Sequence, residues 1–373
     1  MDHSYKITVN GEDRTRVIDD MFVSLSLTDK SGIADDEFEL EVTRDEPRLQ
    51  VPNVGDRVEL ALGYSDGQDY EEYRNIMINH GLYYLNERDF YGPKAKTLVL
   101  SFNPIDMASR FKEVKNRSFD GQTIKQIGET IALDNGLALR IEESLGNILI
   151  DHVDQVMQND KHFISKLVSR YEGILKIAND FMVLARRENI SSFSGESLEE
   201  ITIDLTEVVD YHASEKIDSS YSGVKAFYRN SSEATTSEVV VGTIGNITSI
   251  SQIYPTQEEA REAAQAKFNS LKRKTETLHI KVVGNPLVKA ERVINAIGDP
   301  DINTKWVVSQ VKHTIDKKKG YQTEIDCTAP KEKEKKSYRQ VATTTQEENP
   351  VESSIERDSD NNIVTPDSGK LDQ

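Results

Sequence analysis

The feature that most constrains this chain is the period at which its apolar residues recur, because that period changes twice along the sequence. In residues 37–42 and 57–62, apolar side chains alternate strictly with other residues, as they do along a half-buried β-strand. Between about 112 and 200 the apolar residues recur every three or four positions, as in an amphipathic helix. From about 201 the alternation returns. These changes predict two β-rich regions that flank a helix-containing segment.

Both β-rich regions consist of many short strand-like runs separated by turn residues, a pattern typical of a small barrel or sandwich. The first region, residues 1–111, has further runs at 76–78, 81–85 and 97–102. The second region, residues 201–330, contains one long helix, which a capping box of Thr256 and Glu259 opens and which we expect to reach about Lys274. Strand-like runs follow this helix at 278–283, 288–297, 306–315 and 321–327.

The segment between them, residues 112–200, is predicted to be an α/β insertion with two helices and a hairpin. A helix over 122–134 is expected to begin at Asp120 or Gly121, and a second one over 160–172 is expected to follow an asparagine N-cap and to end at a glycine. Two apolar runs come next, divided by an Asn-Asp pair, and these residues tolerate the positive φ angles of a two-residue hairpin turn.

The last segment, residues 331–373, begins with a run of lysine and glutamate. Beyond Tyr338 it has no aromatic residue and little aliphatic content, so it cannot bury a core and is expected to be a disordered tail. The whole pattern therefore predicts an α+β, β-rich fold with two small β-barrel-like domains, an α/β insertion between them and a disordered C-terminal tail.

Composition excludes several classes of protein. The 46 basic and 64 acidic side chains give a formal charge of −18, and residues 1–111 alone carry 12 basic and 22 acidic ones. Such a surface repels phosphate, so stable binding to duplex DNA or to an anionic membrane is not expected. Cys327 is the single cysteine, which excludes an intrachain disulfide and a cysteine-rich zinc site. No run of about 18 apolar residues predicts a membrane span, and no signal peptide is recognisable.

No pattern of catalytic or cofactor-binding residues stands out, and we expect neither an enzyme nor a bound cofactor or metal. Phosphate-binding glycine motifs and a Gly-x-Ser-x-Gly nucleophile motif are missing from the sequence. The best metal candidates are two histidines ten residues apart with nearby aspartates, a spacing that instead favours a solvated or hydrogen-bonded pair. These candidates are Asp151, His152, Asp154, Asp160 and His162.

Several strings, in this order, resemble the phage late control protein D family. The central one, residues 154–173, has an Asp-Gln pair, a polar cap and a helix with Phe and Leu that ends at Tyr-Glu-Gly, where the family typically has Tyr-Gly. Others are 55–64, 221–224, 284–287, 306–308 and 320–323, together with His313, so the resemblance spans about residues 5–328. The positions that carry it are Gly55, Tyr64, Asp154, Gln155, Phe163, Leu167, Tyr171, Gly173, Gly223, Gly284, Pro286, Trp306, His313 and Gly320.

This resemblance implies a structural baseplate hub protein of a contractile phage tail or related injection machine, similar to the hub part of type VI secretion spike proteins. It implies a homotrimer in which two β-barrel-like domains per subunit form a pseudo-sixfold ring between the tail tube and the central spike. Tape-measure and other baseplate proteins are further expected partners, and DNA is expected only in transit. The location implied is the virion tail baseplate, assembled in the host bacterial cytoplasm.

Two alternatives stay open: a tail-associated cell-wall hydrolase and a β-rich adaptor protein that forms no ring. A hydrolase predicts a cleft with a perturbed carboxylate or a bound metal. The adaptor predicts a monomer at every concentration. For the hub, the acidic first region suits a lumen through which DNA passes without adhering.

Overall fold

The computed structural model of the chain describes residues 3–32, 36–44, 51–64, 76–94, 96–104, 111, 113–186, 200–215, 221–230, 235–243, 245–273 and 276–329. All of them belong to one compact unit, Met1–Glu332. The predicted tail, 331–373, lies outside the described residues. Within the described residues the fold is β-rich with few helices, which confirms the predicted α+β, β-rich class.

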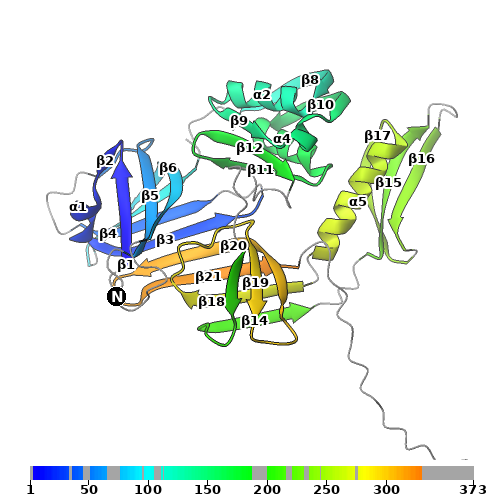
Figure 1. Cartoon of the computed structure of the whole chain (residues 1–373). Coiled ribbons are helices and arrows are strands. Elements are labelled where there is room, and N and C mark those ends of the chain that lie inside the picture. Colours follow the sequence, from blue (N-terminus) through cyan, green and yellow to red (C-terminus); the bar gives the residue numbers. More distant parts are fainter. Residues whose placement is uncertain are drawn as a thin grey trace, which may run out of the picture. The chain divides into compact units, whose positions relative to one another are not determined.

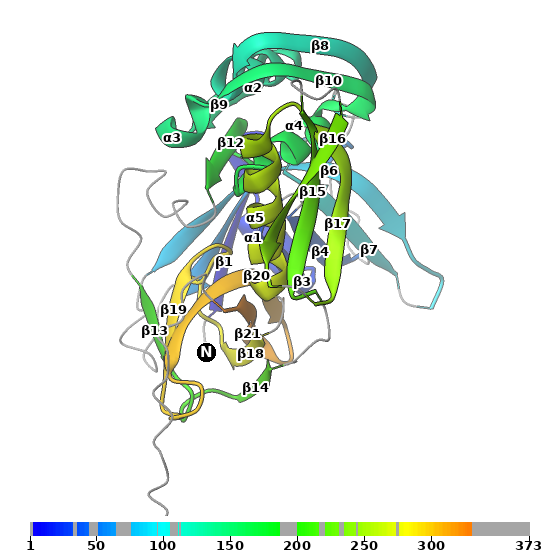
Figure 2. The same ribbon diagram turned by 90° about the vertical axis from the view of Figure 1, so that its right-hand side faces the viewer.

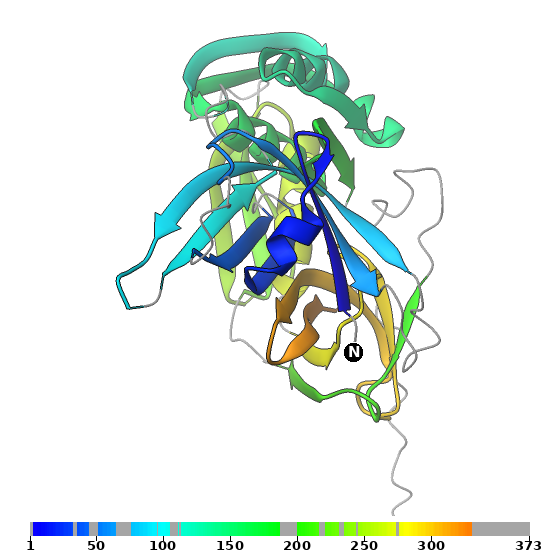
Figure 3. The same ribbon diagram turned by 90° about the vertical axis from the view of Figure 1, so that its left-hand side faces the viewer.

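The first β-rich region folds as a curved antiparallel sheet whose inner face is a large apolar core. Strict alternation places Phe38, Leu40 and Val42 of one strand in that core, while the residues between them face outward. A short helix lies against the strands (Figure 3). The elements are β1 (His3–Val9), β2 (Glu12–Asp13), α1 (Thr15–Asp19), β3 (Phe22–Lys30), β4 (Glu37–Thr43), β5 (Arg57–Tyr64), β6 (Met77–Phe90) and β7 (Thr97–Asn103).

Strands of the second β-rich region continue the same sheet, because β20 pairs antiparallel with β3 over Lys30 to Ser24 (Figure 1). The sheet has 13 strands, ordered β14-β18-β21-β20-β3-β4-β7-β6-β5-β1-β2, with β19 and β13 branching from β20. A second core, around Trp306, lies in this part. The added strands are β13 (Ile201–Asp204), β14 (Asp210–Glu215), β18 (Glu276–Val283), β19 (Val293–Ile297), β20 (Thr304–Asp316) and β21 (Gly320–Thr328).

The middle segment has its own core, built from two small sheets and the helices between them. An antiparallel two-stranded ribbon, β8 with β10, forms one sheet, and the other has the order β11-β12-β9. The elements are β8 (Val114–Thr123), α2 (Ile124–Asp134), β9 (Ala138–Ile141), α3 (Glu143–Gly146), β10 (Leu149–Asn159), α4 (Asp160–Ser169), β11 (Gly173–Ala178) and β12 (Phe181–Arg186).

The long helix belongs to a fourth core, which is distinct from the cores of the 13-stranded sheet. It lies on one face of a three-stranded sheet of order β16-β15-β17 (Figure 2). Its alanines belong to that core. The elements are β15 (Gly223–Asn230), β16 (Thr235–Gly242), β17 (Ile247–Tyr254) and α5 (Gln257–Arg273). The sequence pattern gave no sign that this module is distinct from the strands after it. The domain boundaries 1–111, 112–200, 201–330 and 331–373 stay predictions.

Helix termini follow the capping residues. Thr256 Oγ1 accepts from the Glu259 N–H at 3.2 Å, as predicted for the long helix. Asn159 caps α4 by accepting from the His162 N–H at 2.8 Å. The expected start of the earlier helix at Asp120 or Gly121 is wrong, because both residues lie in β8. Thr123 is the N-cap instead, and its capping box with Gln126 starts the helix at Ile124.

Other departures concern strand and helix ends. The expected strand 288–297 begins only at Val293, and Ala290 and Glu291 before it lie in a turn. Helix α4 ends at Ser169 rather than at residue 172. The two-residue hairpin turn is confirmed: Asn179 and Asp180 have φ angles of 53° and 62°, and β11 pairs with β12 around them. Of the helices among the described residues, none is long and apolar enough to cross a membrane.

Candidate functional site

A buried hydrogen-bonded seam joins the two β-rich regions through residues that lie far apart in sequence. The hydroxyl of Tyr64, at the end of β5, donates to the Gly284 carbonyl at 2.6 Å across 220 residues of chain. A Cβ on Gly284 would stand 2.1 Å from the Tyr321 ring, so only glycine fits against that ring. The Tyr321 hydroxyl lies 2.9 Å from Nδ1 of His313. Three of the positions that carry the family resemblance, Tyr64, Gly284 and His313, therefore lie together in this seam.

His313 is neutral in this seam because it is fully buried. Its Nε2 lies 3.1 Å from the Val288 carbonyl, which assigns the ring proton to Nε2 and leaves Nδ1 to accept from the Tyr321 hydroxyl. Burial lowers the pKa of His313 to about 4. The His80 ring stands 4.9 Å away between centroids, and its own pKa is lowered by burial and then by His313. Two uncharged imidazoles thus pack together.

A buried ion pair joins the insertion to the same part of the sheet. Lys176 of β11 donates its Nζ to Asp29 of β3, and the same Nζ lies 3.3 Å from Asp36 Oδ2. Asp29 also accepts from the Ala290 N–H at 2.9 Å, while Asp36 accepts from the Lys30 N–H at 2.9 Å. We call Lys176, Asp29 and Asp36 the charged junction.

Two carboxyls contact the same lysine here, and their surroundings shift their pKa values in opposite directions. Burial opposes ionisation of Asp29, but attraction to Lys176 and hydrogen bonds outweigh it and keep the pKa of Asp29 below its usual value. Burial, followed by repulsion from Asp29, raises the pKa of Asp36 to about 7. Burial also opposes the charge of Lys176, but the two carboxyls outweigh it and raise the lysine's pKa. Lys176 and Asp29 form the permanent pair, and Asp36 is the member that titrates.

The turn of the β11–β12 hairpin makes a second attachment to the sheet. Asn179 Oδ1 accepts from the Leu82 N–H at 2.9 Å. Asp180 accepts from the Tyr84 hydroxyl at 2.7 Å and from Arg57 Nη2 at 3.1 Å. The hairpin is therefore fixed at its turn and, through Lys176, along its strand.

The central string of the resemblance builds the core of the insertion. Gln155 is fully buried, and its amide donates to Asp160 Oδ1 at 2.9 Å while its carbonyl accepts from Arg117 Nε at 2.8 Å. Phe163 and Leu167 of α4 are core residues, and Tyr171 packs against the same core. Glu172, the residue absent from the family pattern, takes a φ of 60°.

The remaining string positions serve turns and packing. A Cβ on Gly173 would lie 2.9 Å from the Val168 carbonyl, so the close approach of the backbone requires glycine there. Gly223 is similarly confined, Pro286 is buried, and Trp306 Nε1 donates to the Ile302 carbonyl at 3.3 Å. Gly55 and Gly320 have φ angles of 93° and 78° in turns.

The residues considered for metal binding do not converge. His152 Nδ1 lies 2.5 Å from Asp120 and its Nε2 3.1 Å from Asp154, on the exposed face of the ribbon. Asp160 is buried behind that face and binds Lys115 Nζ and Arg117 Nη2 at 2.7 Å each. Across the residues that the structure describes, no cluster of three or more His, Cys, Asp or Glu could hold a metal ion.

The charged junction was missed at the level of sequence. Lys176 is the one charged residue in the run 173–178, which is otherwise apolar or small, and that isolation was the available signal of a buried cation. Asp29 and Asp36 gave no such signal because acidic residues are abundant throughout the first region. Lys176 follows Asp29 by 147 residues and Asp36 by 140, so only the tertiary fold brings the three together.

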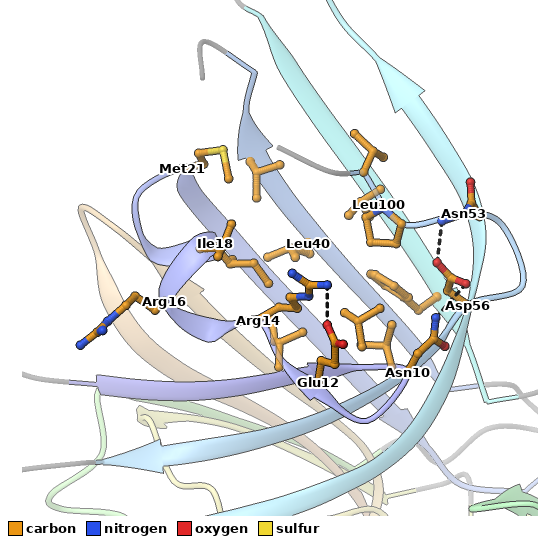
Figure 4. A pocket seen from close by; sticks show the side chains of 18 of the residues that line it. Asn10, Glu12, Arg14, Arg16, Ile18, Met21, Leu40, Asn53, Asp56 and Leu100 are labelled. Carbon is orange, nitrogen blue, oxygen red and sulfur yellow. Dashed lines mark hydrogen bonds and ion pairs between the residues drawn. The ribbon is translucent and has the colours of Figure 1, made fainter. Parts of the chain in front are cut away.

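The first β-rich region also contains a hollow of about 1270 Å³, lined inside by Leu40, Val58 and Phe102. Its rim carries the Arg14–Glu12 ion pair and the hydrogen bond from Asn53 N–H to Asp56 (Figure 4). These rim groups are already paired with each other. Among the described residues that line the hollow, these rim pairs form no set of catalytic groups converging on one point.

Comparison with solved structures defines the class of this fold. A 43 kDa tail protein of prophage MuSo2 from Shewanella oneidensis superposes with a TM-score of 0.64 at 12% identity, over 88% of this chain and 99% of that one. A component of the type VI secretion system from Escherichia coli gives 0.53 at 10% identity, over 88% and 76%. The fold is that of phage tail proteins and their type VI counterparts.

Two baseplate hub proteins of phages are similar to this chain in sequence. The chain is 20% identical to the probable baseplate hub protein of Escherichia phage 186, over 84% of this chain and 89% of that protein. It is also 20% identical to the probable baseplate hub protein of Escherichia phage P2, over 86% and 92%. No family model matches the sequence. The predicted resemblance to phage baseplate hub proteins is thereby confirmed.

Proposed function

We propose that this protein is a non-enzymatic baseplate hub of a contractile phage tail or related injection machine, of the late control protein D type. Three copies form a ring that joins the tail tube to the central spike. The similarity to baseplate hub proteins over most of the chain supports the assignment. The location is the tail baseplate of the particle, after assembly in the bacterial cytoplasm.

The observation that carries the ring is the pairing of β20 with β3. It joins two β-rich regions, each with its own core, into one continuous sheet. A trimer of such subunits presents six β-rich units around one axis, which matches a sixfold tube on one side and a threefold spike on the other. The acidic first region then faces the lumen and repels DNA in transit.

Light scattering on the purified protein, alone and with its spike protein, tests this proposal. The expected mass is three times 42.1 kDa, or 126.3 kDa. Negative-stain images then show a threefold ring with a central hole. A concentration-independent monomer under both conditions contradicts the hub and supports the adaptor. Peptidoglycan turnover by the purified protein supports the cell-wall hydrolase instead.

A further inference from the structure

The β8–β10 ribbon exposes an apolar patch that its own fold leaves uncovered. Val114, Val156 and Met157 are 52%, 59% and 71% exposed. The opposite face of the ribbon contributes Phe119 and Val153 to the core of the insertion. Val156 and Met157 lie in a bulge between Gln155 and Gln158, and Val114 of the other strand is paired with Asn159 just beyond it. We call Val114, Val156 and Met157, with Asp154 and with Asp120 farther along the ribbon, the ribbon patch.

The bulge is held in a fixed conformation. Met157 has a φ of 49°, which is uncommon for a residue other than glycine. Its N–H donates to Asn116 Oδ1 at 2.8 Å, and the Asn116 amide approaches the Met157 sulfur at 3.8 Å. Because these contacts fix the bulge, Val156 and Met157 stand ready for a partner without further ordering.

The three-stranded sheet exposes a second patch on the face opposite α5. Val224 and Ala226 pack against the helix, so strand alternation directs Phe227 to the other face. There it pairs with Ile253 of β17, while Val240 of β16 lies opposite Lys225. We call Phe227, Val240 and Ile253, with Lys225, Arg229 and Glu238, the sheet patch.

The two patches are complementary in charge as well as in apolar character. In the sheet patch, Lys225 is paired with Glu238 at 2.8 Å, and the exposed Arg229 leaves the patch positive. The ribbon patch holds two carboxylates around a single histidine, His152, and is negative. Apolar centres with oppositely charged rims are the arrangement of specific protein interfaces.

We propose that the sheet patch of one copy binds the ribbon patch of the next copy. A closed ring requires such a heterologous contact, in which every subunit offers two different surfaces to its neighbours. The interface rests on the homotrimer proposed above and names the surfaces that build it. Arg229 faces Asp154 across it, and Phe227 packs on Val156.

Single substitutions test the apolar centre. Phe227→Ser and Val156→Ser are each expected to weaken trimer formation about tenfold or more in sedimentation experiments. Phe90→Ser is the matched control, since Phe90 is 53% exposed in β6 and outside both patches. It is expected to change trimer formation less than about threefold. Circular dichroism verifies that each variant is folded.

A charge exchange tests the pairing itself. Arg229→Glu and Asp154→Arg are each expected to weaken trimer formation. The double variant is expected to form the trimer about tenfold more tightly than either single variant, because opposite charges face each other again. If the wild type is a trimer but the patch variants weaken it no more than Phe90→Ser does, and the double variant shows no recovery, this interface is wrong. The hub proposal then stands. A wild-type monomer, alone and with the spike, overturns the hub as well.

Discussion

The charged junction and the seam around Tyr64 occupy neighbouring positions, yet they hold the chain together by different means. The junction ties the insertion to the sheet with Lys176 and two carboxyls. The seam ties the two β-rich regions together with neutral groups, a tyrosine hydroxyl, a carbonyl and an uncharged imidazole. A buried charge that loses its partner costs far more than a neutral group that loses one hydrogen bond. The two contacts therefore differ in how much each substitution costs.

The largest effect is expected from Lys176→Met. The substitution keeps the length and apolar stem of the side chain but leaves Asp29 and Asp36 buried without their cation. We expect the free energy of unfolding, measured by urea denaturation, to fall by about 3–5 kcal/mol. Lys281→Met is the control, because Lys281 lies outside both patches and its partner Glu324 is 39% exposed, and it is expected to cost less than about 1 kcal/mol. Equal losses from both would show that the junction contributes no more than a surface pair.

Next in size is Gly284→Ala, which tests the seam by adding a single methyl group. The new Cβ would collide with the Tyr321 ring, which is itself fixed by packing, so we expect a loss of about 1–3 kcal/mol in unfolding free energy. In Gly146→Ala the nearest atom outside the local backbone is 3.4 Å away, an ordinary contact, and stability is expected to stay within about 1 kcal/mol. If both variants denature at the same urea concentration, Gly284 is not confined as described.

Sequence reasoning succeeded where a local signal decides the structure. The Asn179-Asp180 turn and the Thr256 capping box depend on a few adjacent residues, and both were predicted. The β-rich class followed from strict alternation. The start of α2 was misplaced because Asp120 and Gly121 resemble a helix N-terminus as well as Thr123 does, and only pairing of β8 with β10 distinguishes them.

The candidate site depended on contacts that no local signal carries. Tyr64 and Gly284 were singled out separately by resemblance, but their hydrogen bond spans 220 residues and requires the continuous sheet. Asp29 and Asp36 look like ordinary acidic residues of a strand and its turn until Lys176 is placed between them. The separate module of α5 was equally hidden, since its strands alternate as the others do.

A smaller effect is expected from Tyr64→Phe. The ring stays, and the Gly284 carbonyl loses its hydroxyl donor, so the unfolding free energy is expected to fall by about 1 kcal/mol. Tyr91→Phe is the matched change at an exposed tyrosine and is expected to leave stability unaltered. A Tyr64→Phe loss as large as that of Lys176→Met would contradict the distinction between a neutral and a charged contact.

The last effect concerns the pH dependence of stability, which has opposite signs for the two contacts. The pKa of Asp36 is about 7 in the folded protein and near 3.8 when unfolded, so ionising this carboxyl costs stability progressively as pH rises through that range. The lowered pKa values of His313 and His80 act oppositely, because these buried bases resist protonation and stability is lost as pH falls below about 6.5.

Asp36→Asn removes only the first of these dependences. Asparagine keeps an oxygen for the Lys30 N–H and lacks the charge that Asp29 repels. The histidine effects are common to both proteins and cancel in the difference. We expect the unfolding free energy of the variant, relative to wild type, to rise by about 2–3 kcal/mol between about pH 5 and about pH 8. A difference that stays constant, or that falls with pH, would mean that Asp36 is ionised throughout and that Lys176 neutralises both carboxyls equally.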